Sequence, residues 1–384
     1  MTTRAPVQPE LLTWARERAG LDMADLAHRF AKIDDWERGE LQPTLKQLQD
    51  FANAVHAPIG YLFLPAPPEE TLPIPDFRTV DGAGVRRASP DLLDVIYSCQ
   101  ERQSWYRDYA RANRQAELAF ISSASVDEAP ETVAATIAET LQIDVTARAA
   151  CRDWEAARRQ MIAQAEAAGV LVMVSGVVLS NNTRKLDPEE FRGFALADAR
   201  APLIFINGAD SKSAQMFTLA HELAHLWLGA TAVSNASAAP ASGFRAEEVW
   251  CNAVAAELLV PLASIQSDAA PDDELPELVA RLTRQYKVST LVILRRLLDA
   301  GWLARAAFDT AWAAERARLR RLAERGTGGG NFYATTLTRV SRRFTRAVVE
   351  STLEGQTLYR DAFRMLGVKK TATFEHLGQE VGVV

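Results

Sequence analysis

The stretch Phe217–Gly229, FTLAHELAHLWLG, is almost wholly apolar, yet it carries two of the chain's five histidines. His221 and His225 are four residues apart, and Glu222 directly follows the first of them. On a helix, residues four apart lie on one face, so the two imidazoles can share one metal ion. Glu222 lies beside that face, where its carboxylate can reach a water on the metal without binding the metal. The spacing predicts two zinc ligands and a general base on one buried helix.

The alternative for this helix is a pair of core histidines that are hydrogen-bonded to backbone carbonyls. Burying two histidines and a glutamate costs several kcal/mol unless they are paired or bound to metal. A metal ion would satisfy all three groups at once, so the apolar flanks favour the metal site.

A catalytic zinc ion needs a third protein ligand and an open position for water. Glu248 and Asn252 lie four residues apart in a second predicted helix. We expect Glu248 to bind the metal and Asn252 to accept a hydrogen bond from a ligand histidine. Glu247 and Glu257 are rival ligands, although Glu247 points about 100° away from Glu248 around the helix. The other interpretation of Glu248 is a surface carboxylate.

These residues predict hydrolysis of a peptide bond. A zinc ion lowers the pKa of a bound water and polarises a carbonyl, and Glu222 would take the water's proton and deliver it to the leaving amine. Manganese is a second possible metal. The group that stabilises the oxyanion is open, with Tyr286, Tyr333 and a further histidine as candidates.

The pattern along the chain predicts a mainly α fold with a small antiparallel β-sheet, an α+β class. We expect three strands, in VLVMVSG, FRGFALAD and PLIFING, and a motif helix from about Lys212 to Leu228. The polar segment after Gly229 reads as a loop. The expected organisation is a helical domain at 1–64, a Pro-rich linker with a long helix at 65–120, a catalytic domain at 121–300 and a basic helical domain at 301–384.

Charge and cysteine content limit the classes of protein. The formal net charge is −6, although the residues from Gly301 onward hold 14 Lys or Arg against 8 Asp or Glu. That basic block is either a solvated helical face or a partner surface. The three cysteines form no CxxC pair, which fits a reducing cytoplasm. We find no signal peptide and no membrane-spanning run, so a cytoplasmic protein without membrane contact is expected.

The two helices together, FTLAHELAHLWLG and EEVWCNAVAAELLVP, resemble the ImmA/IrrE metallopeptidases, which are gluzincin-like. The resemblance extends over about residues 160–300 and implies a zincin-like catalytic domain. It assigns His221, His225 and Glu248 as metal ligands and Glu222 as the base. The chain departs from the family pattern at Cys251 and Val254, both packing positions.

The resemblance also implies a substrate class. Members of the family cleave helix-turn-helix repressors or antitoxin-like partners in stress-response or mobile-element settings. We therefore expect such a protein as substrate, with a co-encoded toxin as a further possible partner.

The first 64 residues resemble an Xre/Cro-type helix-turn-helix module, through WERGELQPTLKQLQDFANAV. Lys32, Trp36 and Arg38 are its candidate DNA- or partner-contacting residues. The segment that would enter the major groove is short, however, and carries Asp34 and Asp35, which DNA phosphates would repel. Two functions stay open: a metallopeptidase whose module docks a protein, or a DNA-binding regulator in which the protease site is secondary or silent.

Overall fold

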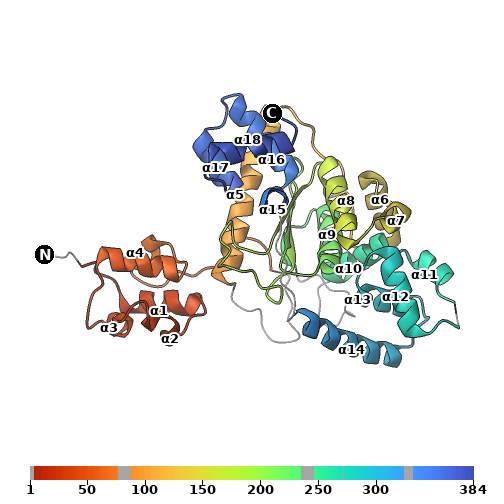
Figure 1. Cartoon of the computed structure of the whole chain (residues 1–384), viewed down its shortest axis with the longest axis horizontal. Coiled ribbons are helices and arrows are strands. Elements are labelled where there is room, and N and C mark those ends of the chain that lie inside the picture. The colour runs from red at the N-terminus through yellow and green to blue at the C-terminus, as the bar shows by residue number, and fades with distance from the viewer. Residues whose placement is uncertain (1–3, 77–87, 235–245, 271, 324–331) are drawn as a thin grey trace. The chain divides into compact units, whose positions relative to one another are not determined.

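The computed structural model describes residues 4–76, 88–234, 246–270, 272–323 and 332–384 (Figure 1). The chain divides into two compact units. Unit 1 comprises residues 1–73 and 86–97, and unit 2 comprises residues 74–85 and 98–384. The division falls inside the long helix α5 (Pro90–Ala112), so this helix contributes to both units.

Unit 1 is built from short helices around its own apolar core. They are α1 (Pro9–Arg18), α2 (Met23–Ala27), α3 (Ile33–Glu37), α4 (Leu45–Ala54) and the 3-10 helix η1 (Ile59–Phe63). Asp22 and Thr44 begin α2 and α4 with reciprocal capping boxes, which satisfy backbone donors at each helix start. Leu11, Leu12 and Phe51 are fully buried between the helices.

Unit 2 holds the remaining helices and the sheet. Its first helices after α5 are α6 (Pro130–Leu141), α7 (Val145–Ala149), α8 (Trp154–Ala167), α9 (Lys212–Leu228) and α10 (Ala246–Leu259). They are followed by α11 (Leu262–Asp268), α12 (Leu275–Tyr286), α13 (Thr290–Asp299) and α14 (Arg305–Ala323). The last are α15 (Phe332–Val340), α16 (Arg342–Leu353), α17 (Tyr359–Leu366) and α18 (Thr371–Glu380). The predicted class, mainly α with a small sheet, is confirmed.

The sheet has the order β1-β3-β2-β4, with β1 (Leu171–Ser175), β2 (Gly193–Leu196), β3 (Leu203–Asn207) and β4 (Ala232–Ser234). It is mixed, which corrects the expectation of an antiparallel sheet. Strands β2 and β3 form the predicted antiparallel pair, but β1 takes the other edge of β3 and runs parallel to it. Strand β4 pairs antiparallel with β2 inside a segment that reads as a loop from sequence.

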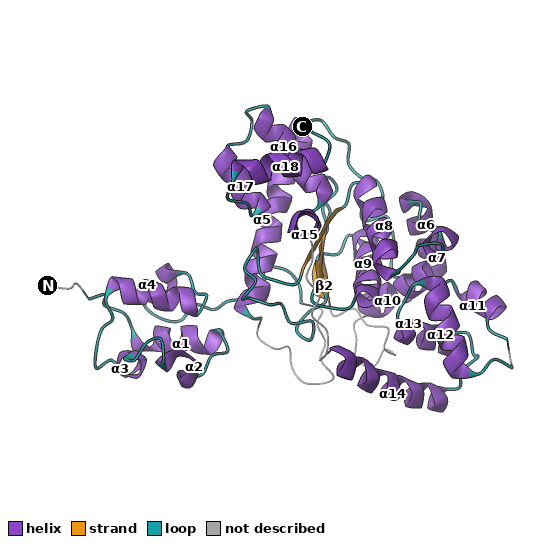
Figure 2. Ribbon diagram, viewed as in Figure 1, coloured by secondary structure: helices purple, strands orange, loops and turns teal. Residues whose placement is uncertain are grey.

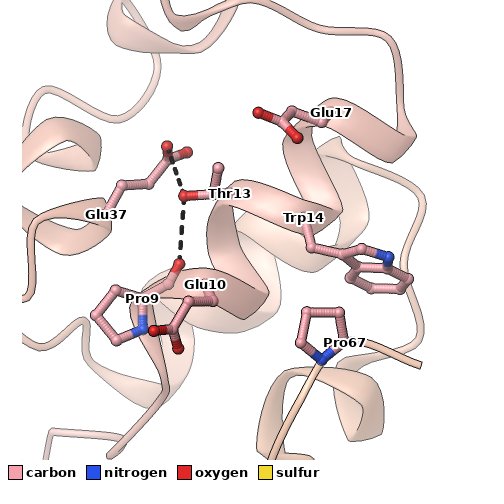
Figure 3. Close-up of a pocket in the computed structure, with 7 residues that line it drawn as sticks. All are labelled: Pro9, Glu10, Thr13, Trp14, Glu17, Glu37 and Pro67. Carbon is pink, nitrogen blue, oxygen red and sulfur yellow. Dashed lines mark hydrogen bonds between the residues drawn. The ribbon is translucent and has the colours of Figure 1, made fainter. Parts of the chain in front are cut away.

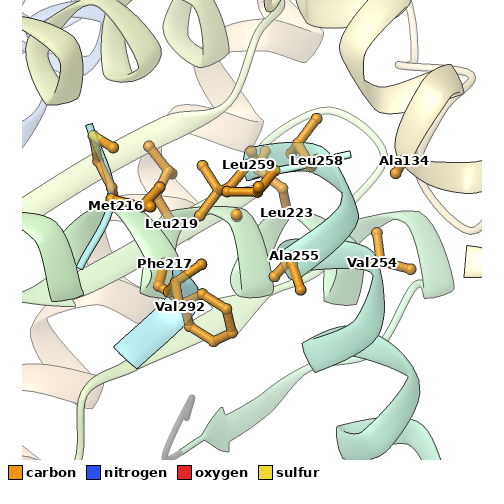
Figure 4. Packing of buried hydrophobic residues seen from close by; sticks show 14 of the residues in the cluster. Ala134, Met216, Phe217, Leu219, Leu223, Val254, Ala255, Leu258, Leu259 and Val292 are labelled. Carbon is orange, nitrogen blue, oxygen red and sulfur yellow. The ribbon is translucent and has the colours of Figure 1, made fainter. Parts of the chain in front are cut away.

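Helices cover both faces of this sheet, and every strand residue is buried. Figure 2 shows α8 and α9 on one side of the sheet and α15 on the other. The main core forms where α9 packs against α10. Figure 4 shows this packing, with Met216, Phe217, Leu219 and Leu223 of α9 close to Val254, Ala255, Leu258 and Leu259 of α10.

Local signals set the ends of α9, the helix that carries the histidines. Ser211 caps its start by accepting a hydrogen bond from the backbone N–H of Ala214. Gly229 ends it in a left-handed conformation, φ 71°, which a residue with a Cβ rarely adopts. A Cβ on Gly229 would also collide with the Ser122 hydroxyl. The predicted bounds, Lys212 to Leu228, are therefore confirmed.

After α14, the predicted helical C-terminal part contains four separate described helices, α15–α18. Glu166 of α8 joins them to the rest of unit 2: its carboxylate accepts hydrogen bonds from the Ser341 hydroxyl and the Arg342 N–H at the start of α16. No single described helix is long and apolar enough to cross a membrane. Among the described helices, only the pair α10 and α11, which are bent by 49° relative to each other, has the length and composition of a membrane span.

Candidate metal centre

Three side chains from α9 and α10 converge in the buried core of unit 2. The Nε2 atoms of His221 and His225 are 3.0 Å apart. Glu248 Oε1 is 3.0 Å from His225 Nε2, and Glu248 Oε2 is 3.4 Å from His221 Nε2. The histidines are 0% exposed and Glu248 is 1% exposed. Glu248 is therefore not a surface carboxylate.

These separations fit a metal ion. A tetrahedral zinc ion with ligand bonds of about 2.0–2.1 Å holds its ligand atoms roughly 3.3 Å apart, close to the measured spacing. The set of two imidazoles and one carboxylate is also one that zinc prefers at catalytic sites. In the part of the chain that the structure describes, no other three His, Cys, Asp or Glu residues meet in this way.

Burial and mutual charge set the pKa values of the three residues in opposite directions. Burial works to raise the pKa of Glu248, but the charges and hydrogen bonds of His221 and His225 outweigh it and lower the pKa to about 2. Burial works to lower the pKa of His221, yet Glu248 raises it overall. For His225, burial prevails and lowers the pKa. Glu248 thus stays anionic, the form that binds a cation.

Glu222 lies directly beside this cluster and is itself 0% exposed. Its Oε1 accepts a hydrogen bond from the hydroxyl of Ser234 on β4. Its Oε2 has no hydrogen-bond partner among the described residues. Burial raises the pKa of Glu222 to about 8.

Asn252 lies one turn after Glu248 on α10, and its side chain contributes to the raised pKa of His221. Nδ1 of His221 has no hydrogen-bond partner among the described residues, so the bond expected from it to Asn252 stays a prediction. The rival ligand Glu257 lies in a different environment. It pairs with Arg296 and accepts the backbone N–H of Leu262. Glu257 therefore belongs to the packing of α10 against α13.

No sequence motif singles out Ser234 or Gly193, yet both lie next to Glu222. They are directly paired across β2 and β4. A Cβ on Gly193 would lie 3.1 Å from Oε1 of Glu222. The one available signal is a glycine at the start of an otherwise apolar strand, which often marks a close approach.

Of the two tyrosines predicted as oxyanion-stabilising candidates, Tyr286 is the one whose side chain is described. Tyr286 is buried, and its hydroxyl donates a 2.6 Å hydrogen bond to Asp268. The side chain of Tyr333 lies outside the described residues.

The candidate contact residues of unit 1 have different surroundings. Trp36 is only 2% exposed and packs against Phe30 in the core, so it does not form part of the surface. Arg38 is exposed but ion-paired with Asp34, Asp35 and Glu40. Lys32 is exposed at the start of α3. None of these placements favours reading of DNA bases.

Unit 1 also has a cavity of about 440 Å³, lined by Trp14, two prolines and the carboxylates of Glu10, Glu17 and Glu37 (Figure 3). Glu37 is occupied by Thr13 and Arg16, which both donate hydrogen bonds to it. The lining has no histidine or cysteine.

Comparison with known protein families finds two matching family models. Residues 165–298 match the model of the Peptidase M78 family, described as IrrE N-terminal-like domain. Residues 340–380 match a second family model, described as Domain of unknown function (DUF8813). No curated protein matches the chain. The first match spans β1 to α13, including both helices of the cluster, and it supports a peptidase domain of the ImmA/IrrE type at residues 165–298.

Proposed function

We propose that this protein is a zinc-dependent endopeptidase, with His221, His225 and Glu248 as metal ligands and Glu222 as the general base. The observation that carries the proposal is the convergence of two imidazole nitrogens and the Glu248 carboxylate in a buried site, with the nitrogens 3.0 Å apart and each of them 3.0–3.4 Å from a carboxylate oxygen. Manganese is the alternative metal, because the same nitrogen and oxygen donors accept it.

Each residue has a distinct task in this proposal. The bound zinc ion supplies a Lewis acid and an activated water. Glu222 takes a proton at Oε2, the oxygen that Ser234 does not hold, and returns it to the leaving amine. Asn252, one turn after Glu248 on α10, would accept a hydrogen bond from the free ring nitrogen of His221 and hold that ring in place.

The proposed substrate is a regulatory protein, either a helix-turn-helix repressor or an antitoxin. Support comes from the likeness to ImmA/IrrE peptidases and from the small helical unit 1, which offers a second surface for a protein partner. Unit 1 has net acidic character, 7 Lys or Arg against 9 Asp or Glu through residue 60, which suits protein docking better than DNA binding.

The test is a digestion of a proteome-derived peptide library by the full-length chain, read by mass spectrometry. We expect cleavages with added zinc, none after removal of metal with a chelator, and recovery when zinc is restored. The same assay with intact helix-turn-helix repressors or antitoxins encoded beside the gene tests the substrate class. A zinc-loaded protein that cuts neither peptides nor these proteins would contradict the proposal.

A further inference from the structure

We infer that Ser234 is a positioning residue for Glu222: its hydroxyl fixes one carboxylate oxygen so that the other faces the reacting water. This inference rests on the proposed function and extends it to a residue outside both sequence motifs. It is carried by the contacts of Ser234, Gly193 and Glu222 in the folded chain.

The hydrogen bond assigns different roles to the two oxygens of Glu222. Ser234 Oγ donates to Oε1, whereas Oε2 has no partner among the described residues. Both side chains are 0% exposed, so the serine hydroxyl takes the place of bulk solvent as the donor to Oε1. A carboxylate held at one oxygen cannot rotate freely, and its second oxygen keeps a fixed direction.

The backbone of Ser234 is itself held in the sheet. Strand β4 pairs with β2 in the register Gly193↔Ser234 and Phe194↔Val233. On the opposite edge of β4, the N–H of Val233 donates a 3.0 Å hydrogen bond to the carbonyl of Pro75. Because β4 is paired on both edges at Val233, the backbone that carries the Ser234 hydroxyl is held in place.

Gly193 supplies the room that this arrangement requires. Residues directly opposite each other in a sheet point to the same face, so a side chain at 193 would enter the space beside Ser234. A Cβ there would lie 2.6 Å from Cγ2 of Thr218 and 3.1 Å from Oε1 of Glu222. In the Gly193–Ser234 pair, Ser234 therefore supplies the hydrogen-bond donor to Glu222, and Gly193 leaves room for the carboxylate because it has no side chain.

Loss of the Ser234 hydroxyl should affect the chemical step rather than metal binding. Within the described chain, this hydroxyl bonds to Glu222 and not to His221, His225 or Glu248. A small displacement of a catalytic group can reduce a rate by about 100-fold, and outer groups that orient a site typically contribute about 10–100-fold.

The experiment uses the zinc-loaded full-length chain and a fluorogenic peptide taken from a cleavage that the wild type makes in the peptide library. We expect Ser234→Ala to lower kcat by about 10–100-fold, with KM and zinc affinity unchanged. Ser234→Thr, which keeps the hydroxyl, should recover most of kcat. The matched control is Ser175→Ala, because Ser175 is also a buried sheet serine but bonds to Val177.

Wild-type kcat in Ser234→Ala would overturn the inference. Loss of zinc together with activity, without recovery in the threonine variant, would overturn it as well, since that pattern indicates a structural role. If Ser234→Ala does not fold, Ser234→Cys takes its place in this test. Cysteine has nearly the same size as serine, and its thiol is only a weak hydrogen-bond donor. Absence of any cleavage by the zinc-loaded wild type is a different result, because it contradicts the proposed function itself.

Discussion

Gly193 and Glu222 approach each other so closely that a Cβ on the glycine would lie 3.1 Å from the carboxylate. The contact joins the start of β2 to the middle of α9, two elements separated by β3 in the chain. The space beside the proposed base is therefore set by an absent side chain, and this can be tested directly.

Gly193→Ala should push Glu222 or Thr218 aside. We expect a loss of about 1–3 kcal/mol in the free energy of unfolding, as is typical of overpacked cores, and a lower kcat. Chemical denaturation and peptide hydrolysis measure the two effects. Gly60→Ala is the control, because an added Cβ there meets nothing within 4 Å. Equal stability and activity in both variants would contradict the close approach.

Glu248→Ala should abolish tight metal binding, because it removes the carboxylate that neutralises the cluster. We expect zinc affinity to fall by at least about 100-fold, beyond the usual effect of an outer-shell change. Competition with a chromophoric chelator gives the affinity. Glu247→Ala is the matched control on the neighbouring residue and should bind zinc as the wild type does. Equal effects of the two substitutions would refute the assignment.

Metal removal should lower the thermal stability of the chain. An ion that binds only the folded state at about 100 times its Kd adds about 2.7 kcal/mol, so Tm should rise with added zinc and fall with chelator. The zinc-dependent shift should be absent in Glu248→Ala. A shift of the same size in that variant would place the stabilising ion elsewhere.

Glu166 should make stability depend on pH. Burial raises the pKa of this carboxyl above its ordinary value of 4.5. The folded state therefore binds the proton more tightly, and its stabilising effect is complete below pH 4.5 and is lost as pH rises through the folded pKa. Glu166→Gln can still accept from Ser341 and Arg342 through its amide oxygen. We expect the free energy of unfolding of Glu166→Gln to increase relative to that of the wild type as pH rises. A difference between the two that does not change with pH would contradict this.

Unit 1 should not read DNA sequence. Arg38 is paired with three carboxylates, and Trp36 is in the core. In gel-shift titrations at physiological salt, the full-length chain should bind its own upstream DNA no more tightly than unrelated DNA of equal length. A sequence-specific complex that is lost in Lys32→Ala would instead support the regulator function.

The sequence was most informative where the determining interactions are local. The four-residue spacing of His221 and His225 and the caps Ser211 and Gly229 all lie within one helix, so its bounds could be predicted. The prediction of Glu248 as a ligand rested on its four-residue spacing from Asn252 in a second helix and on the family resemblance. Trp36 shows the limit, because an aromatic residue in a short helix is compatible with either a surface or a core position.

The rest depended on contacts between distant segments. The pairing of β4 with β2, and with it the position of Ser234, follows from the assembled sheet and not from a pattern in three residues. The parallel pairing of β1 with β3 likewise depends on which edge of the antiparallel β2–β3 pair is left free for a further strand. Strand pairing of this kind leaves little trace in a short polar segment.

The proposed hydrolysis requires Glu222 to act as the base at a metal site formed by its neighbours. The most direct test measures zinc content and peptide hydrolysis on one preparation of Glu222→Gln beside the wild type. We predict wild-type zinc content and a hydrolysis rate lower by at least about 100-fold. A zinc-loaded Glu222→Gln that hydrolyses peptide at the wild-type rate would contradict the account.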